Sequence, residues 1–441
     1  MTVLESPPGT HWTLRTEHAV AGGRCLARVE GKIVLVAGAL PGETVRVRVT
    51  RDEKRFAEAD VVEVVEAHPE RRDPPCPYAA ECGGCDFQHA TPSLQREMKR
   101  SIVIDAFRRI ARLDVESILD GPADGPEFRY RRRIRLSTDP AGRSGLLRRG
   151  SHEVVPIDDC LLMVPAFADV VLPWLRLAPP WKRAGVRVDS SGDSVVLFET
   201  GDPPNEKDRR RYGNITKAME RPETIRGLLA DGVPLSGARE LSFRVRDREL
   251  RADATSFFQG NETATEELVN AVEGYLGEGR GTLVDLYAGV GLFSACLGDG
   301  FERIVAVESD RRAARHLKRN LKRFGSRVRI LAESAEVALR TLPAGSDETV
   351  VIDPPRVGLS KEARERLAAR APARIVSVSC DPATAARDTA SLVASGYTLE
   401  HLRVIDMFPV TAHIETVALF VRGVMRAASA PPRTPASSTS T

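Results

Sequence analysis

The pattern of apolar and polar positions divides the chain into three regions. Residues 11–66 hold short runs of alternating or β-branched residues separated by glycine turns, which predicts a small all-β barrel. The segment 128–250 is again rich in predicted strands. From 282 to 422, predicted strands and helices alternate, which is typical of a doubly wound parallel sheet. The last two predicted strands lack an intervening helix, so we expect an antiparallel edge hairpin.

Two connecting segments differ from these regions in composition and periodicity. The residues after Pro69 are rich in Pro, Gly and Cys and form a loop that needs something external to order it. Residues 93–112 show helical periodicity, with apolar side chains on one side.

Composition and charge set the broad class of the protein. The 441 residues are 42% hydrophobic and 28% charged, enough for two or three domains with cores. The net charge is only +3, so basic residues matter through local patches. The N-terminus has no basic region followed by an apolar run, and no apolar stretch approaches the roughly 20 residues of a membrane span. We therefore expect a cytoplasmic protein with no membrane partner.

Basic residues gather at two places that could meet a polyanion. On the predicted strand ETVRVRV, valines alternate with Glu43, Arg46 and Arg48, so one face is apolar and the other partly basic. An ordinary solvated face is the favoured alternative there. The run FRYRRRIRL (128–136) holds five arginines with Phe128 and Tyr130 interleaved, which fits nucleic acid as well as a solvated face.

The first predicted strand of the C-terminal region ends in a glycine turn, DLYAGVG (285–291). A strand followed by such a turn and a helix brings backbone close to a nucleotide-like ligand. The turn is a poor dinucleotide fingerprint, because Ser294 stands where a third glycine is expected. Asp285, and Glu308 at the end of the next strand, suit the amino-acid end and the ribose of S-adenosylmethionine. A structural turn that binds nothing is the less favoured alternative.

Two further residues follow predicted parallel strands, where such sheets place their ligands. They are Asp353 and Cys380. Most single cysteines are packing residues. Cys380, however, precedes a predicted helix start, which stabilises a thiolate and favours a nucleophile. Glu415, which opens the final strand after His413, is a candidate base, although such a carboxylate can also be merely a surface group.

One reaction needs a thiol, a base and a sulfonium donor together. Thiolate addition at C6 of uracil makes C5 nucleophilic enough to accept a methyl group. A base must then remove the C5 proton so that the thiol can leave. Cys380, Glu415 and the glycine turn supply these parts.

Five motifs give the chain a specific resemblance to bacterial RNA uracil-5-methyltransferases, particularly the 23S ribosomal RNA type. The similarity extends over nearly all of residues 11–422. The motifs are SFFQGN (256–261), DLYAGVG (285–291), DPPR (353–356), SCDPAT (379–384) and FPVTAHIET (408–416).

The resemblance implies roles for particular residues. Cys380 is the implied nucleophile and Glu415 the implied general base. The implied ligands of S-adenosylmethionine are Gln259, Tyr287, Glu308 and Asp353. The family's best-known member has Asn where this chain has Leu292, so one cofactor contact differs.

The resemblance also implies a multidomain α/β architecture. It comprises an OB-like TRAM barrel, a central antiparallel β-rich domain with an iron–sulfur loop, and a Rossmann-like class I methyltransferase domain. The TRAM barrel favours ribosomal RNA over transfer RNA as the partner, and we expect a monomer. The expected bounds are a disordered N-terminus (1–10), the barrel (11–67), the central domain (68–92 and 120–250), the methyltransferase domain (93–119 and 251–423) and a disordered tail (424–441).

Four of the seven cysteines form a metal-ligand pattern: Cys76, Cys82 and Cys85, with Cys160 as a distant fourth. Four thiolates can hold zinc or an iron–sulfur cluster. Zinc sites more often use two C-x2-C pairs, and this chain has one. The resemblance implies a [4Fe-4S] cluster.

Three other functions would use some of the same residues, but the sequence disfavours each of them. An RNA-binding protein with a degenerate catalytic domain is disfavoured by the intact motifs. A cytosine-5 methyltransferase is disfavoured by the motif around Glu415. An iron–sulfur redox enzyme is disfavoured because the cysteine loop shows no second set of catalytic residues. Methylation of transfer RNA by the same chemistry remains an alternative.

Overall fold

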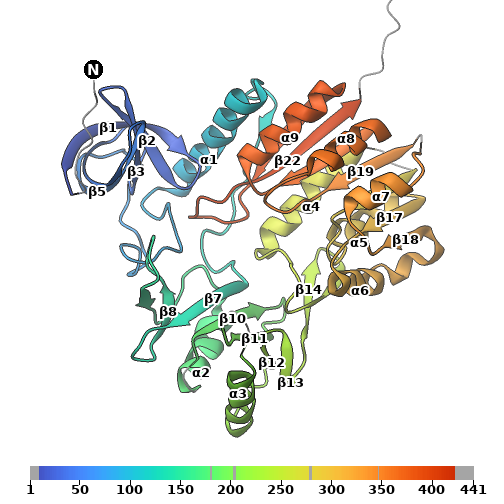
Figure 1. The fold of residues 1–441 in the computed structure, drawn as a ribbon, viewed down its shortest axis with the longest axis horizontal. Helices are drawn as coiled ribbons and strands as arrows, with labels where there is room; N and C mark the ends of the chain where they lie inside the picture. The colour runs from blue at the N-terminus through green and yellow to red at the C-terminus, as the bar shows by residue number, and fades with distance from the viewer. Residues whose placement is uncertain (1–8, 179–180, 202–204, 278–280, 346, 423–441) are drawn as a thin grey trace, which may run out of the picture.

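The computed structural model describes residues 9–178, 181–201, 205–277, 281–345 and 347–422. It contains a small barrel, a mixed sheet and a larger sheet covered by helices (Figure 1). The disordered ends predicted at 1–10 and 424–441 lie outside these ranges, apart from residues 9 and 10. Within the described ranges, no helix has the length and apolar character needed to cross a membrane.

Five strands close the N-terminal barrel, as predicted, in the order β1-β2-β3-β5-β4. Val45, Val47 and Val49 alternate along β4 and are buried inside the barrel, so the apolar face predicted for this strand is confirmed. The strands are β1 (His11–Val20), β2 (Arg24–Val29), β3 (Lys32–Ala37), β4 (Thr44–Asp52) and β5 (Phe56–Glu66).

Glu43 departs from the expectation of an exposed face, because its side chain is fully buried. Its carboxylate accepts hydrogen bonds from Arg71 Nε at 2.6 Å and from the backbone amides of Leu40 and His68. Burial raises the pKa of Glu43, but these hydrogen bonds outweigh burial and hold the pKa below its usual value. The pair ties the barrel to the start of the cysteine-rich loop.

The central sheet has seven strands in the order β13-β12-β11-β10-β7-β8-β9. It is antiparallel, as predicted, except that β11 and β12 are parallel. The helix α3 (Glu206–Ala218) connects these two strands, and such a crossover returns the chain in the same direction. The other elements are β7 (Arg133–Thr138), β8 (Ser144–Leu147), β9 (Val154–Pro156), α2 (Leu172–Leu177), β10 (Arg183–Val188), β11 (Ser194–Glu199), β12 (Ile225–Ala230) and β13 (Val233–Gly237).

The largest sheet has the order β18-β17-β16-β19-β20-β22-β21-β6. The strands from β18 to β20 are parallel, and β22 is antiparallel to both β20 and β21. The predicted antiparallel hairpin therefore forms, but it is not at the edge of the sheet, because β22 lies next to β20 and β21 pairs with β6. The strands are β6 (Leu119–Asp120), β16 (Thr282–Leu286), β17 (Arg303–Val307), β18 (Val328–Leu331), β19 (Glu348–Ile352), β20 (Arg374–Ser379), β21 (Tyr397–Ile405) and β22 (Glu415–Arg422).

Helices cover both faces of this sheet and form two hydrophobic cores (Figure 1). One core includes residues of α1 (Pro92–Ala106), α7 (Ala335–Thr341), α8 (Lys361–Arg370) and α9 (Pro382–Ala394). The other includes α4 (Glu262–Leu276), α5 (Leu292–Leu297) and α6 (Arg311–Asn320). The hairpin of β14 (Glu240–Val245) and β15 (Arg248–Asp253) contributes to this second core.

Candidate active site

Cys380 and Glu415 meet because β22 runs against β20. Ser379, the last residue of β20, is the register partner of Thr416. Cys380 directly follows Ser379, and Glu415 directly precedes Thr416. Both therefore lie at the same edge of the sheet. The Thr416 hydroxyl also donates to the Ser379 carbonyl at 3.3 Å. This edge is the carboxyl end of the parallel strands, where such sheets bind ligands.

Asp353 joins them from the neighbouring strand, because it directly follows β19. Its amide donates to the Leu286 carbonyl at the end of β16. Burial, together with the charge of the nearby Asp285, raises the pKa of Asp353 to about 7. Burial and the charge of Asp353 raise the pKa of Glu415 well above its usual value. Carboxyl groups this close to one another resist being ionised together.

The Cys380 thiol lies in an environment that opposes its ionisation. Burial raises its pKa to about 11, and the charges of Glu415 and Asp353 act in the same direction. Arg356 opposes them, since a nearby cation favours the thiolate. The thiol is therefore protonated at neutral pH in the absence of ligands. A thiol must lose its proton before it can act as a nucleophile.

The glycine turn after β16 is shaped for a close ligand. Gly289 and Gly291 have left-handed φ angles of 57° and 96°, and a side chain added to Gly289 would meet open space. Tyr287 also has a left-handed φ, 63°, which is uncommon for a bulky residue. The sequence therefore places two glycines and one strained tyrosine where the backbone turns into α5.

Asp285, in β16, holds the glycine turn through hydrogen bonds with Ser294 of α5. Its Oδ2 accepts hydrogen bonds from the Ser294 amide at 3.1 Å and the Ser294 hydroxyl at 2.6 Å. Its Oδ1 is buried without a hydrogen-bond partner among the described residues. Burial raises the pKa of Asp285 to about 6, although the bonds from Ser294 oppose that rise. An unpartnered carboxylate oxygen at this position suits a cationic amino group.

Glu308 holds the other side of the turn from the end of β17. One carboxylate oxygen accepts the Gly289 amide at 2.8 Å, and the other accepts the Asp310 amide at 2.6 Å. Each oxygen keeps a second lone pair for a hydroxyl group. This position is the one that carries the ribose-binding carboxylate in nucleotide-binding α/β folds.

Comparisons with known proteins agree with this geometry. Residues 238–423 match the model of the tRNA (Uracil-5-)-methyltransferase family, and residues 16–62 match the TRAM domain. An uncharacterized RNA methyltransferase of Streptomyces avermitilis is 34% identical, with 90% of this chain and 95% of that protein covered. A 23S rRNA (uracil(1939)-C(5))-methyltransferase, RlmD, of Chromohalobacter salexigens is 34% identical, with 94% of this chain and 90% of that protein covered.

The chain belongs to the RNA uracil-5-methyltransferase family. A solved structure supports the same fold: the Pyrococcus abyssi tRNA (uracil-54, C5)-methyltransferase in complex with S-adenosyl-L-homocysteine. It is 25% identical, with a TM-score of 0.69 and coverage of 92% of this chain and 99% of that one. The resemblance predicted from the motifs is thus confirmed, as is the TRAM assignment of the barrel.

Gln259 lies on the connection between β15 and α4 of the methyltransferase. Its side chain is buried and lines a small cavity of about 10 Å³ with Arg132 and Phe258. Among the described residues, it forms no hydrogen bond with Tyr287, Glu308 or Asp353. Its neighbour Phe258 stacks on Phe243 at 4.3 Å between ring centroids.

The segment that leads into Glu415 is held by polar side chains that the motifs did not reveal. We call residues 406–412 the base-positioning loop. Among the described residues, side chains of five residues from other segments hydrogen-bond to its backbone at 2.8 to 3.2 Å: Asp86, Gln95, Lys99, Tyr130 and Asn261. Gln95 and Lys99 lie on the buried side of α1. Their position among apolar neighbours is the sequence pattern that could have indicated buried polar contacts.

The arginine run divides between structural and exposed positions. Arg129 pairs with Asp159 and Arg132 with Glu262, so these two guanidinium groups stabilise the fold. Tyr130 was a candidate for base stacking, but it is buried and its hydroxyl donates to the Pro409 carbonyl. Arg135 is largely exposed and pairs with Glu199.

The four predicted metal ligands line one cavity of about 250 Å³. Cys76, Cys82 and Cys85 come from the cysteine-rich loop, and Cys160 reaches the cavity from the central domain. Burial, together with the charges of the three other cysteines, raises the pKa of Cys85 to about 12. Among the described residues, no three His, Cys, Asp or Glu side chains are arranged to hold a metal ion.

Proposed function

We propose that this methyltransferase methylates C5 of a uridine in RNA, with Cys380 as nucleophile and Glu415 as base. The observation that carries the proposal is the pairing of Ser379 with Thr416, which brings thiol and carboxyl to one sheet edge. The influence of Glu415 and Asp353 on the Cys380 pKa supports their proximity. Uracil C5 chemistry uses these groups together.

The chain's own groups would act in a fixed order. Cys380 loses its proton to water, and its sulfur bonds to C6 of uracil, which leaves the electron pair of the C5–C6 double bond at C5. S-adenosylmethionine, when bound, supplies an electrophilic methyl group to that carbon. Glu415 then takes the C5 proton, and the electrons of that C–H bond restore the C5–C6 double bond as the sulfur leaves. A raised carboxyl pKa makes Glu415 a stronger base when ionised.

The methyl donor would be held at the glycine turn. Asp285 offers its unpartnered Oδ1 to the donor's amino group, and Glu308 offers free lone pairs to the ribose. We assign Tyr287, Gln259 and Asp353 as further ligands from their motifs. Leu292 is buried in the core beneath the turn, so its side chain contributes packing there.

Ribosomal RNA is the favoured substrate class. The TRAM match and the relatives named as 23S rRNA methyltransferases support it. Transfer RNA is the second candidate, because the Pyrococcus abyssi protein is named for it. Mapping 5-methyluridine in both RNAs from a deletion strain distinguishes them: the position that loses the modification identifies the substrate.

We also propose that the cysteine cavity holds a [4Fe-4S] cluster in the central domain. Four cysteines from two distant segments line one cavity, and four thiolates are the usual ligands of such a cluster. The cluster would join residues 68–92 to the central segment 120–250. The barrel (11–67) would then bind RNA and the segments 93–119 and 251–423 would carry out the chemistry.

The catalytic proposal is tested with two variants and radiolabelled S-adenosylmethionine. Cys380→Ala is expected to bind RNA but transfer no methyl group, because the adduct cannot form. Glu415→Gln is expected to accumulate an RNA–protein complex that survives denaturation, because the adduct forms but cannot be resolved. Methyl transfer by Cys380→Ala, or no stable complex with Glu415→Gln while the wild type turns over, would contradict the assignment.

A further inference from the structure

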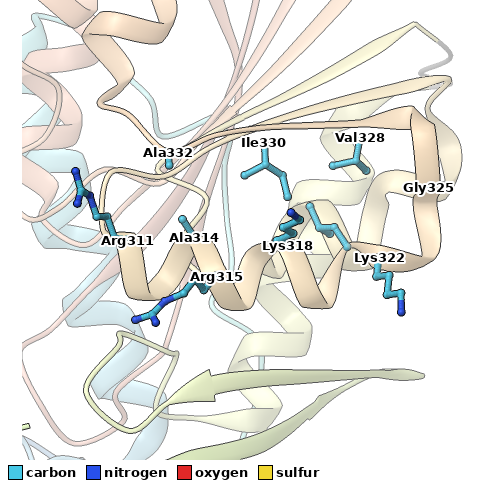
Figure 2. Close-up of a pocket in the computed structure, with 10 residues that line it drawn as sticks. Arg311, Ala314, Arg315, Lys318, Lys322, Gly325, Val328, Ile330 and Ala332 are labelled. Atoms are coloured by element: carbon cyan, nitrogen blue, oxygen red, sulfur yellow. The ribbon is translucent and has the colours of Figure 1, made fainter. Parts of the chain in front are cut away.

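A basic groove lies between α6 and β18, outside the site described above. Its volume is about 940 Å³. Figure 2 shows Val328 and Ile330 pointing from the strand toward the helix, and basic side chains distributed along the helix. Ala314 and Leu321 complete an apolar floor. The groove therefore combines an apolar surface with cations, which are the two features that RNA strands contact.

The cations of this groove are not neutralised by the protein. They are Arg311, Arg315, Lys318 and Lys322, and none has an ion-pair or hydrogen-bond partner among the described residues. Other basic residues nearby are paired: Arg319 with Glu240, and Arg323 with Asp299. None of the residues that line the groove is acidic. A separate negative partner would satisfy the four charges.

The spacing of the four cations suits an extended polyanion. Positions 311, 315, 318 and 322 recur every three or four residues, which places them along one side of the helical segment. They cover eleven residue steps, or about 16 Å at roughly 1.5 Å per residue. Regular charge over that length matches several successive phosphates of one strand.

The groove also begins beside the cofactor site. The Glu308 amide donates to the Leu331 carbonyl at 3.0 Å, and Ala332, the next residue, lines the groove. Arg311 lies three positions after Glu308 at the start of α6. A strand that leaves Cys380 would pass the carboxyl ends of β19, β16 and β17 before it enters the groove.

We propose that the groove between α6 and β18 binds the RNA strand that flanks the target uridine. The inference rests on the proposed function for its choice of RNA as the occupant. Its charge and its continuity with the cofactor edge favour RNA over an acidic peptide. The contact is made to phosphates, so it adds affinity without reading sequence.

The test uses the full chain and a fluorescent single-stranded oligouridylate that carries 4-thiouridine. Binding is followed by anisotropy at increasing KCl, and irradiation maps the cross-linked peptides. We expect cross-links within residues 311–332. The variant Arg315→Gln/Lys318→Gln should bind more weakly, and its slope of log affinity against log salt should fall by about 1.4, or about 0.7 for each lost contact.

The matched control is Arg329→Gln/Lys361→Gln, which removes two exposed charges from the same domain. Neither residue lines the groove, so affinity and slope should stay near the wild type. Equal behaviour of the two double variants, or the absence of cross-links in 311–332, would overturn the proposal. So would tight binding of an oligoglutamate peptide that the groove variant loses while it keeps oligouridylate binding. These readouts measure binding, so they remain informative even if the chain methylates no RNA.

Discussion

The thiol of Cys380 is surrounded by groups that disfavour its charge. Burial, Glu415 and Asp353 all raise its pKa, and Arg356 alone among the contributing side chains lowers it. Such a thiol reacts slowly with adventitious electrophiles, because the thiolate is the reactive form. With the role proposed for Cys380, we expect the thiol to be activated only in the complex in which RNA is positioned.

This environment predicts a pH dependence. Because the pKa of Cys380 is raised to about 11, the thiolate fraction of the free enzyme rises about tenfold per pH unit below that value. We expect log(kcat/KM) for methyl transfer to rise with a slope of about 1 from roughly pH 7 to pH 9, since this parameter reports ionisations of the free enzyme. A rate that is flat or falls over this range would contradict control of the rate by the ionisation of Cys380.

Individual site residues could be predicted where a motif places them directly after a strand. Cys380, Asp353 and Glu308 follow their strands, and the alternation of strands and helices sets that position. The burial of Glu43 could not be predicted, because it depends on Arg71, which lies 28 residues later in the loop. Two residues that are buried together but lie far apart along the chain leave no local pattern in a single sequence.

Among the elements, α1 has a role beyond covering the sheet. Its Lys99 is completely buried and donates to Asp406 at 2.6 Å and to the Phe408 carbonyl at 3.0 Å. Burial lowers the pKa of Lys99, while Asp406 opposes that change. One buried cation thus fixes the start of the base-positioning loop, which leads into Glu415.

Replacing Lys99 should loosen that loop. In Lys99→Met, Asp406 loses its partner and the Phe408 carbonyl loses its donor, a change on the order of 3 kcal/mol for a broken buried pair. We expect amide hydrogen exchange in residues 406–416 to accelerate by roughly 100-fold, at about 1.4 kcal/mol per factor of ten. The control is Arg109→Met, which removes an exposed pair with Asp105 and should leave exchange unchanged.

The helix itself follows from its sequence, but its contacts do not. The periodicity of residues 93–112 predicted the apolar side of α1, and Thr91 caps its start. The partners of Gln95 and Lys99 in residues 406–412 are more than 300 residues away along the chain. The parallel pairing of β11 and β12 was likewise missed, because α3 has few apolar residues to distinguish a crossover helix from a loop.

In the whole molecule, the cysteine-rich loop connects all three regions. Arg71 at its start pairs with Glu43 of the barrel, and its cysteines share a cavity with Cys160 of the central domain. Its Asp86 accepts the Ala412 amide at 2.8 Å, which reaches the base-positioning loop. The loop therefore links the cavity mechanically to the catalytic edge.

The proposed cluster can be tested on this link. Protein purified without oxygen should be brown and hold about four iron atoms per chain. Cys85→Ser should lose the iron and accelerate amide exchange across residues 408–412. Cys25→Ser should retain both iron and protection, because Cys25 is buried in the barrel. A colourless protein that contains zinc would contradict the iron–sulfur assignment.

The position of the antiparallel strand β22 in the sheet has a consequence for the order in which the enzyme folds during synthesis. It is the last of the described strands in chain order, yet it lies between β20 and β21 and opens with Glu415. A chain emerging from the ribosome can assemble β16 to β20 and their helices first, but β21 has no place in that sheet until β22 arrives. With the roles proposed for Cys380 and Glu415, the nucleophile and the donor site form before the base does, so we expect the nascent chain to stay catalytically silent until β22 is inserted.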